Sequence, residues 1–272
     1  MIRREDNVKI LYDTFDVFNR KSIPLKLSTE EMKKAIVVFP DEIKEPEASE
    51  TCKTDYRCEN TTSFSMAEKL ILTRKNNDRN ILVLNLASPT HPGGGVRRGS
   101  SAQEEDLCRK SSLLFSLESR DASPYYKYNR NENNCACNIR KMASDAVIIS
   151  PNVEVIKDSN NQVLNDSFVV SVITCAAPNI REGLGDVSES EYQNIMRSRI
   201  HAMLCAAAMF GHKDLVLGAL GCGVYRNDAK FVAKVFYDVL EQNNYGFANV
   251  WFAVLDNTKE QYNFKNFSHY FK

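Results

Sequence analysis

From residue 60 onward the sequence alternates between short apolar runs and amphipathic segments, and this alternation limits the fold more than any other feature. The apolar runs are uninterrupted and of strand length, which is typical of strands covered on both faces of a sheet. They span residues 80–87, 145–156, 167–178, 214–220 and 249–256. Between these runs, apolar residues recur with helical spacing at 63–75, 102–119, 188–211 and 227–243, and a short polar helix is predicted at the C-terminus. This order predicts an α/β fold with a mixed sheet between two helical layers, an α/β/α arrangement.

The first 60 residues are more polar and less regular than the rest of the chain. Residues 4–20 predict one amphipathic helix, and residues 34–40 predict a short strand that Pro40 stops. We therefore expect an N-terminal accessory extension over residues 1–60, packed on a core domain over residues 61–272. The polar segment 125–141 is predicted to be an exposed loop.

Charge and cysteine usage exclude several classes of protein. The 35 basic and 35 acidic residues balance, and a protein that follows nucleic acid through phosphate contacts needs a basic excess. The eight cysteines form no CxxC pair and the four histidines show no paired ligand spacing, so no metal site is predicted. No apolar run approaches the roughly 20 residues that span a bilayer. We expect a soluble, cytoplasmic, monomeric protein without a cofactor.

Two glycine-rich turns follow two of the predicted strands. Gly93, Gly94 and Gly95 come after the strand at 80–87, and residues 221–223 come after the strand at 214–220. Glycine permits positive φ and lets backbone N–H groups approach a ligand oxygen, although a flexible turn is the plain alternative for either one. Turns at the carboxyl ends of parallel strands meet at the edge of the sheet where ligands bind. We predict a diphosphate held between them, covered by the ring of Tyr225.

Gln103, Glu104 and Glu105 stand at the start of the predicted helix that follows the first glycine turn. Adjacent helical side chains diverge by about 100°, so the two carboxylates cannot flank one bond as the acids of a standard glycosidase do. One acid must carry the proton while the other holds the ligand. The plain alternative is that acids in a first helical turn only offset the helix dipole. Burial and the neighbouring charge are expected to raise a carboxyl pKa, as a general acid near neutral pH requires.

The glycine run, a spacer of seven residues and the Gln-Glu-Glu motif together resemble the microbial-type branch of the poly(ADP-ribose) glycohydrolase family, which is built on a macrodomain. The stretches NLAS, CRKSSL, SPNVEVI, VITCAAPN and LVLGALGCGVYRND also resemble that family. The similarity covers roughly residues 60 to 256, so residues 61–272 are predicted to be a macrodomain-like catalytic domain.

The resemblance implies a role for each motif residue. Glu105 would protonate the 2′ oxygen that leaves the ribose–ribose bond and then activate water, while Glu104 would hold ribose hydroxyls and orient its neighbour. Tyr225 stands where family members usually carry Phe. The substrate-binding residues implied are Asn85, Gly93, Gly94, Gly95, Val96, Gln103, Gly221, Cys222, Gly223, Val224 and Tyr225, with no metal or cofactor.

The activity that the resemblance implies is hydrolysis of the O-glycosidic bonds of poly(ADP-ribose) from chain ends, with ADP-ribose as product. Polymer or ADP-ribosylated protein would be the substrate, and the reaction would reverse ADP-ribosylation, including in a DNA damage response. Two alternatives stay open: a macrodomain hydrolase of single ADP-ribose marks, and a reader that binds ADP-ribose without cleaving it. A reader has no need for two glutamates after the glycine turn. A redox or zinc protein would need a ligand cluster that the spacing does not show.

Overall fold

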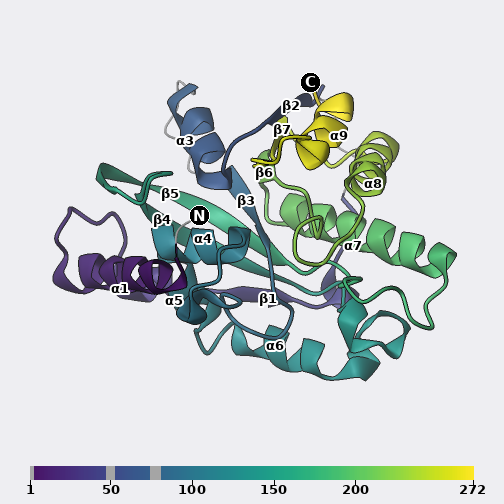
Figure 1. Cartoon of the computed structure of the whole chain (residues 1–272), viewed down its shortest axis with the longest axis horizontal. Coiled ribbons are helices and arrows are strands. Elements are labelled where there is room, and N and C mark those ends of the chain that lie inside the picture. Colours follow the sequence, from purple (N-terminus) through teal and green to yellow (C-terminus); the bar gives the residue numbers. More distant parts are fainter. Residues whose placement is uncertain (1–2, 47–52, 74–80) are drawn as a thin grey trace.

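The computed structural model describes residues 3–46, 53–73 and 81–272 and contains one seven-stranded mixed sheet (Figure 1). In spatial order the strands are β1 (Ile36–Val38), β4 (Val147–Lys157), β5 (Val163–Cys175), β3 (Ile81–Leu86), β6 (Asp214–Leu217), β7 (Asn249–Ala253) and β2 (Asp55–Glu59). From β5 to β2 all neighbours run parallel, whereas β4 is antiparallel to β1 and β5. The predicted mixed sheet is confirmed, and the strands before the two glycine turns, β3 and β6, are parallel neighbours.

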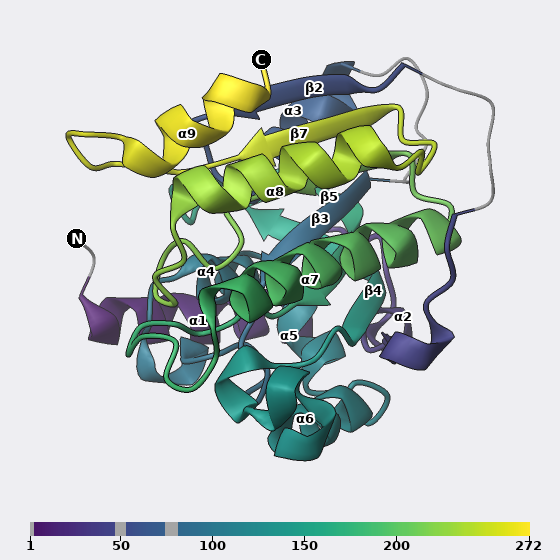
Figure 2. The ribbon, with the colours of Figure 1, turned by 90° about the vertical axis from the view of Figure 1, so that its right-hand side faces the viewer.

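Helices cover both faces of this sheet. They are α1 (Arg4–Arg20), α2 (Thr29–Met32), α3 (Ser63–Thr73), α4 (Gln103–Lys110), α5 (Leu113–Leu117), α6 (Ser123–Arg130), α7 (Glu189–Met209), α8 (Ala229–Gln242) and α9 (Tyr262–Tyr270). Figure 2 shows α7, α8 and α9 on the face turned to the viewer, and their apolar side chains form one core cluster with the strands. Side chains of α3, α4, α5 and α6 form a second cluster with the opposite sheet face. The three-layer prediction is confirmed.

Most predicted elements lie where the hydrophobic pattern placed them. Residues 74–75 of the predicted helix and residue 80 of the predicted strand lie outside the described residues. No helix in the described part of the chain has the length and apolar composition that crossing a bilayer requires.

The helix predicted over residues 102–119 is two helices, because the chain turns extended at Ser111. This residue has φ −150° and ψ 178° and forms an antiparallel bridge with Val155 of β4. The Ser112 hydroxyl accepts a hydrogen bond from the backbone N–H of Glu154 at 2.9 Å. Serine side chains offer the backbone such alternatives to a helical ladder. The prediction of one continuous helix was wrong, and α4 is a short helix of eight residues.

The segment predicted as an exposed loop, residues 125–141, is largely structured. Most of α6 lies within it, followed by three 3₁₀ turns, η3 (Glu132–Asn134), η4 (Ala136–Asn138) and η5 (Arg140–Met142). The rings of Tyr125 and Tyr126 are 0% and 2% exposed and pack edge to face against each other. Tyrosine has an apolar ring as well as a polar tip, so counting it as polar misjudged this segment.

The N-terminal helix α1 is fixed to the elements that surround the predicted site. The buried ammonium of Lys157 on β4 pairs with Asp13 at 2.7 Å and donates to the Thr14 hydroxyl at 2.9 Å. The Asn7 amide donates to the Gly99 carbonyl at 3.0 Å, in the chain between the glycine run and α4. Residues before 60 also supply both edge strands, β1 and β2. The domain boundary at residue 60 stays a prediction.

We predict that Lys157→Met lowers the free energy of unfolding by about 2 kcal/mol, because it removes the donor to the buried Thr14 hydroxyl and the ion pair with Asp13. Urea unfolding monitored by circular dichroism measures this change. Lys9→Met is the matched control: its exposed ammonium lies 3.9 Å from Asp6, and its loss should cost less than about 0.5 kcal/mol. Equal costs for the two variants would contradict the docking role of Lys157.

Candidate active site

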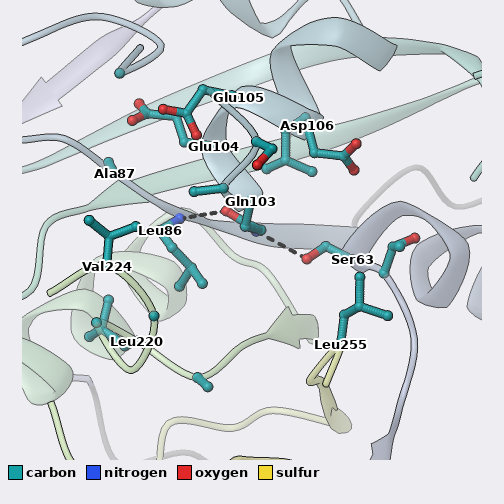
Figure 3. Close-up of a pocket in the computed structure, with 18 of the residues that line it drawn as sticks. Ser63, Leu86, Ala87, Gln103, Glu104, Glu105, Asp106, Leu220, Val224 and Leu255 are labelled. Atoms are coloured by element: carbon teal, nitrogen blue, oxygen red, sulfur yellow. Dashed lines mark hydrogen bonds between the residues drawn. The ribbon is translucent and has the colours of Figure 1, made fainter. Parts of the chain in front are cut away.

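A cavity of about 910 Å³ opens at the carboxyl ends of β3, β6 and β7, beside the start of α4. Eight of the residues predicted from the sequence line it: Gly94, Gln103, Glu104, Glu105, Gly221, Gly223, Val224 and Tyr225. The other five, Asn85, Gly93, Gly95, Val96 and Cys222, are not among its lining residues. Figure 3 shows both glutamate carboxylates turned to the same side, while that of Asp106 points away from them.

The Glu104 carboxylate is buried and held at both oxygens. Its Oε2 accepts the backbone N–H of Ser88 at 2.8 Å, and its Oε1 accepts a longer hydrogen bond from the Asn85 amide at 3.4 Å. Burial raises the pKa of Glu104 to about 8, with a further contribution from the charge of Glu105, against the opposing effect of these hydrogen bonds. The raised carboxyl pKa expected from the sequence thus lies at Glu104, the acid to which the resemblance assigned ribose binding.

The Glu105 carboxylate has one fixed oxygen and one open oxygen. Its Oε1 accepts the backbone N–H of Gly95 at 2.8 Å. Its Oε2 is buried and has no hydrogen-bond partner among residues 3–46, 53–73 and 81–272. Buried polar atoms almost always have a partner, so an unpartnered oxygen at a cavity wall indicates a site for a ligand hydroxyl or water.

The glycine run uses its N–H groups on the protein itself. Gly93 donates to Glu104 and Gly95 donates to Glu105, while Gly94 donates to a loop carbonyl, that of His91, at 3.0 Å. The N–H of the next residue, Val96, donates within the run to the Gly93 carbonyl at 3.1 Å. All four of these N–H groups thus bond within the protein, and the predicted contact of this run with a diphosphate stays a prediction.

The two carboxylates approach Gly94 too closely for any side chain. Gly94 has φ +58°, and a Cβ on it would lie 2.6 Å from Glu105 Oε1 and 2.9 Å from Glu104 Oε2. Such contacts are far inside van der Waals distance. Glycine is thus required here so that both acids can lie against the loop backbone.

The second glycine turn differs, because its N–H groups stay available. Gly221 has φ +73° and accepts a hydrogen bond from the Asn227 amide at 3.0 Å, which fixes the turn. The backbone N–H groups of Gly223, Val224 and Tyr225 donate no hydrogen bond within the described part of the chain. All three residues line the cavity, so this turn presents free donors to an anionic ligand.

Tyr225 lies between the second turn and the end of β3. Its hydroxyl lies 3.5 Å from the Ala87 carbonyl, at the limit of a hydrogen bond. Burial and the nearby charge of Glu104 raise the pKa of Tyr225 to about 12. Tyr225 thus lines the same cavity as the acid pair, and its predicted contact with a bound ligand stays a prediction.

Gln103 holds the start of α4 against β3. Its amide nitrogen donates to the Ser63 hydroxyl at 3.0 Å and the Leu84 carbonyl at 2.7 Å, and its oxygen accepts the Leu86 N–H at 2.8 Å (Figure 3). All of its polar atoms thus bond to the protein. Its predicted contact with substrate stays a prediction.

Asn85 is fully buried behind Glu104. Its amide lies 3.1 Å from the Thr174 hydroxyl and 3.4 Å from Glu104. It does not line the cavity, and in this structure it helps to position the acid; its predicted contact with substrate stays a prediction.

Two further residues shape the site and were not predicted from the sequence. Ser88 supplies the N–H that holds Glu104. Arg109, one helical turn after Glu105, is 3% exposed and donates to the Ser100 carbonyl at 2.6 Å, so it braces the loop that leads into α4. The spacing of four residues between Glu105 and Arg109, which pairs side chains on one helix face, was the available signal.

Comparisons with known proteins give matches to one family. The family model for the microbial-type PARG catalytic domain matches residues 5–158. Among solved structures, poly(ADP-ribose) glycohydrolase (PARG) from Thermomonospora curvata is 29% identical with a TM-score of 0.87, covering 98% of this chain and 100% of that one. The same enzyme bound to the inhibitor ADP-HPD gives a TM-score of 0.84 at 27% identity, with the same coverage of both chains.

The enzyme from Deinococcus radiodurans in complex with ADP-ribose is 32% identical with a TM-score of 0.77, covering 91% of this chain and 98% of that one. The comparison with curated protein sequences gives no significant match. The family model alone spans more than half of the chain and includes the glycine run and both glutamates. The chain belongs to the family of microbial-type poly(ADP-ribose) glycohydrolases.

Proposed function

We propose that this chain hydrolyses the ribose–ribose O-glycosidic bonds of poly(ADP-ribose) and releases ADP-ribose, with Glu105 as general acid and base. The observation that carries the proposal is the open Oε2 of Glu105, a buried carboxylate oxygen without a partner at the wall of a large cavity. Family membership and the relatives solved with ADP-ribose and ADP-HPD support the substrate class. A cytoplasmic location and a part in the DNA damage response stay predictions.

The two oxygens of Glu105 have different tasks in this mechanism. The protonated Oε2 donates to the 2′ oxygen as the glycosidic bond breaks, and the sugar passes through an oxocarbenium-like state. The Gly95 N–H at Oε1 stabilises the carboxylate that results. The same Oε2 then takes a proton from the water that attacks the sugar. One carboxyl thus acts first as acid and then as base, and no second acid has to flank the bond.

Glu104 stays uncharged beside its neighbour. With a pKa of about 8 it carries a proton at neutral pH, so it can donate to a ribose oxygen as well as accept from a ribose hydroxyl. A neutral Glu104 also adds no second negative charge next to Glu105 when that residue ionises. Neighbouring acids with pKa values moved apart by their surroundings commonly divide the tasks in this way.

The rest of the cavity suits an ADP-ribose unit. Its volume of about 910 Å³ lies within the range of small-molecule sites, about 300–1,000 Å³. The free N–H groups of residues 223–225 offer donors to the pyrophosphate, and Arg181 and Arg226 add positive charge at the cavity wall. We therefore assign the pyrophosphate to the second glycine turn rather than to the first.

We predict that Glu105→Gln lowers the rate of ADP-ribose release from polymer by about 10²–10⁴-fold, because the amide keeps the shape but cannot transfer the proton. Affinity for ADP-ribose, measured by calorimetry, should change by less than about threefold because the pyrophosphate contacts remain. Asp106→Asn, on the same helix with its carboxylate turned away, should release ADP-ribose within about fivefold of the natural chain.

Release by Glu105→Gln at the natural rate would place the proton donor elsewhere. Assaying the natural chain on mono-ADP-ribosylated protein separates the alternatives. Faster release from single marks than from polymer would favour the mono-ADP-ribose hydrolase, and binding without release from either substrate would favour the reader.

Gly94→Ala should lower kcat by at least about 10²-fold, because the added Cβ occupies the space of both carboxylate oxygens. Gly183→Ala is the matched control, since Gly183 also has positive φ (+82°) but a Cβ there would meet nothing within 4 Å. Both variants carry backbone strain of about 1 kcal/mol, measurable by urea unfolding. If the two lost activity equally, strain rather than displacement of the acids would be responsible.

The pH profile should show the protonated form of Glu104 as the active one. Because the pKa of Glu104 is raised to about 8, kcat should fall as pH rises above about 8 and the carboxyl loses its proton. Glu104→Gln, which is neutral at every pH, should lose this basic limb while it keeps part of the activity. A basic limb that is unchanged in Glu104→Gln would assign the limb to another group.

A further inference from the structure

Three potential metal ligands meet on the sheet face that α7 covers, and none of them lines the active-site cavity. His201 and Cys205 lie one turn apart on α7, and Glu45 belongs to the segment that follows η1 (Pro40–Glu42). Figure 2 shows this segment passing beside the C-terminal half of α7. One nitrogen, one sulfur and one carboxylate oxygen from these residues all lie within 4.8 Å of one another.

Two of the three donor separations are close to those around a tetrahedral zinc ion, with one oxygen of Glu45 facing His201 and the other facing Cys205. His201 Nε2 lies 3.6 Å from Cys205 Sγ and 2.9 Å from Glu45 Oε1, and Cys205 Sγ lies 3.9 Å from Glu45 Oε2. Zinc bonds of about 2.0–2.3 Å at tetrahedral angles give ligand separations of about 3.4–3.6 Å. The His201–Glu45 pair has to open by about 0.5 Å, which the Glu45 side chain, 75% exposed, is free to do.

A hydrogen bond with the Tyr245 hydroxyl orients the imidazole of His201. Its Nδ1 lies 2.6 Å from the hydroxyl of Tyr245, which is 5% exposed. A hydrogen bond at one ring nitrogen fixes the ring and directs the other nitrogen outward, which is the usual support for a metal-binding histidine. Cys205 is 2% exposed and so is held in place by the packing of α7. A simple surface ion pair between His201 and Glu45 would need neither the buried hydroxyl nor the thiol.

We propose that Glu45, His201 and Cys205 bind one Zn²⁺ ion, with water at the fourth position, and thereby fasten the segment after η1 to α7. Zn²⁺ displaces the proton of the Cys205 thiol, which passes to solvent, and it binds Nε2 of the neutral His201 imidazole in the tautomer that carries its proton on Nδ1. The nitrogen and thiolate ligands select zinc over Mg²⁺ or Ca²⁺, which prefer oxygen ligands alone. The Glu45 side chain is 75% exposed and that of His201 is 28% exposed, so the cluster is open to solvent at these two ligands.

The sequence contained a signal for this site that histidine pairs alone do not reveal. In the stretch HAMLC, residues 201–205, the sulfur of Cys205 comes four residues after the imidazole of His201 within a predicted helix, and this spacing places two side chains on one face. Glu45 comes from a position 156 residues away, so no local motif includes it.

Metal binding to the purified full-length chain tests the proposal. With Zn²⁺ at about a hundred times its Kd, the midpoint of thermal unfolding should rise by about 5–10 °C, and calorimetry should give one ion per chain. Co²⁺ in place of Zn²⁺ should give the ultraviolet charge-transfer band of a cobalt–thiolate bond, which reports sulfur ligation directly. Glu45→Gln should weaken Zn²⁺ binding by about tenfold or more, and Cys205→Ser should abolish the thiolate band.

Cys137→Ser is the matched control, because Cys137 is an exposed free thiol outside this cluster, and it should leave both readouts unchanged. Glu45 is exposed, so Glu45→Gln keeps the test valid if the buried Cys205→Ser variant fails to fold. The proposal is overturned if the natural chain gives no thiolate band, or if Glu45→Gln binds Zn²⁺ as tightly as the natural chain. Release of ADP-ribose from polymer does not enter either readout, so the result is independent of the proposed activity.

Discussion

The close approach of two carboxylates to one glycine governs the architecture of the active site. Glu104 and Glu105 lie against the backbone at Gly94, in the space that a side chain would fill, and neighbouring N–H groups hold them there. That contact requires a loop with positive φ after β3 and a helix that begins a fixed distance beyond it. The surrounding structure serves this requirement: Gln103 fastens the helix start to β3, and α1 braces the intervening loop through Asn7.

The two glycine turns have separate tasks. In the first turn Gly93 and Gly95 give their N–H groups to the acids, whereas in the second turn the N–H groups of residues 223–225 have no partner in the described part of the chain. A parallel pairing of β3 with β6 brings the turns to one edge of the sheet, so the pyrophosphate site that we propose on the second turn lies across the cavity from the acids on the first. In the mechanism that we propose, the substrate is bound at its pyrophosphate, away from the reacting bond, and the acids can change protonation during the reaction.

The sequence predicted the layers and most strands correctly, because uninterrupted apolar runs identify buried strands with little ambiguity. The prediction failed where a few polar atoms determine the backbone conformation, because Ser111 ends α4 by pairing with Val155. It also failed where Tyr125 and Tyr126 bury their rings in a segment whose composition is polar. At the site, the residue types and their spacing in the sequence located the acids and the glycines. Only the structure shows which acceptor each backbone N–H group binds. The contact between Glu45 and His201 joins residues that are far apart in the sequence, so no local sequence pattern could predict it.

A crystal structure of the natural chain with ADP-ribose bound would test this division of tasks most directly. We expect a ribose oxygen within hydrogen-bond distance of Glu105 Oε2 and the pyrophosphate oxygens on the N–H groups of residues 223–225, with Gly95 N–H still on Glu105. A pyrophosphate bound instead to the N–H groups of Gly93 and Gly95, with both carboxylates released from the first turn, would contradict it.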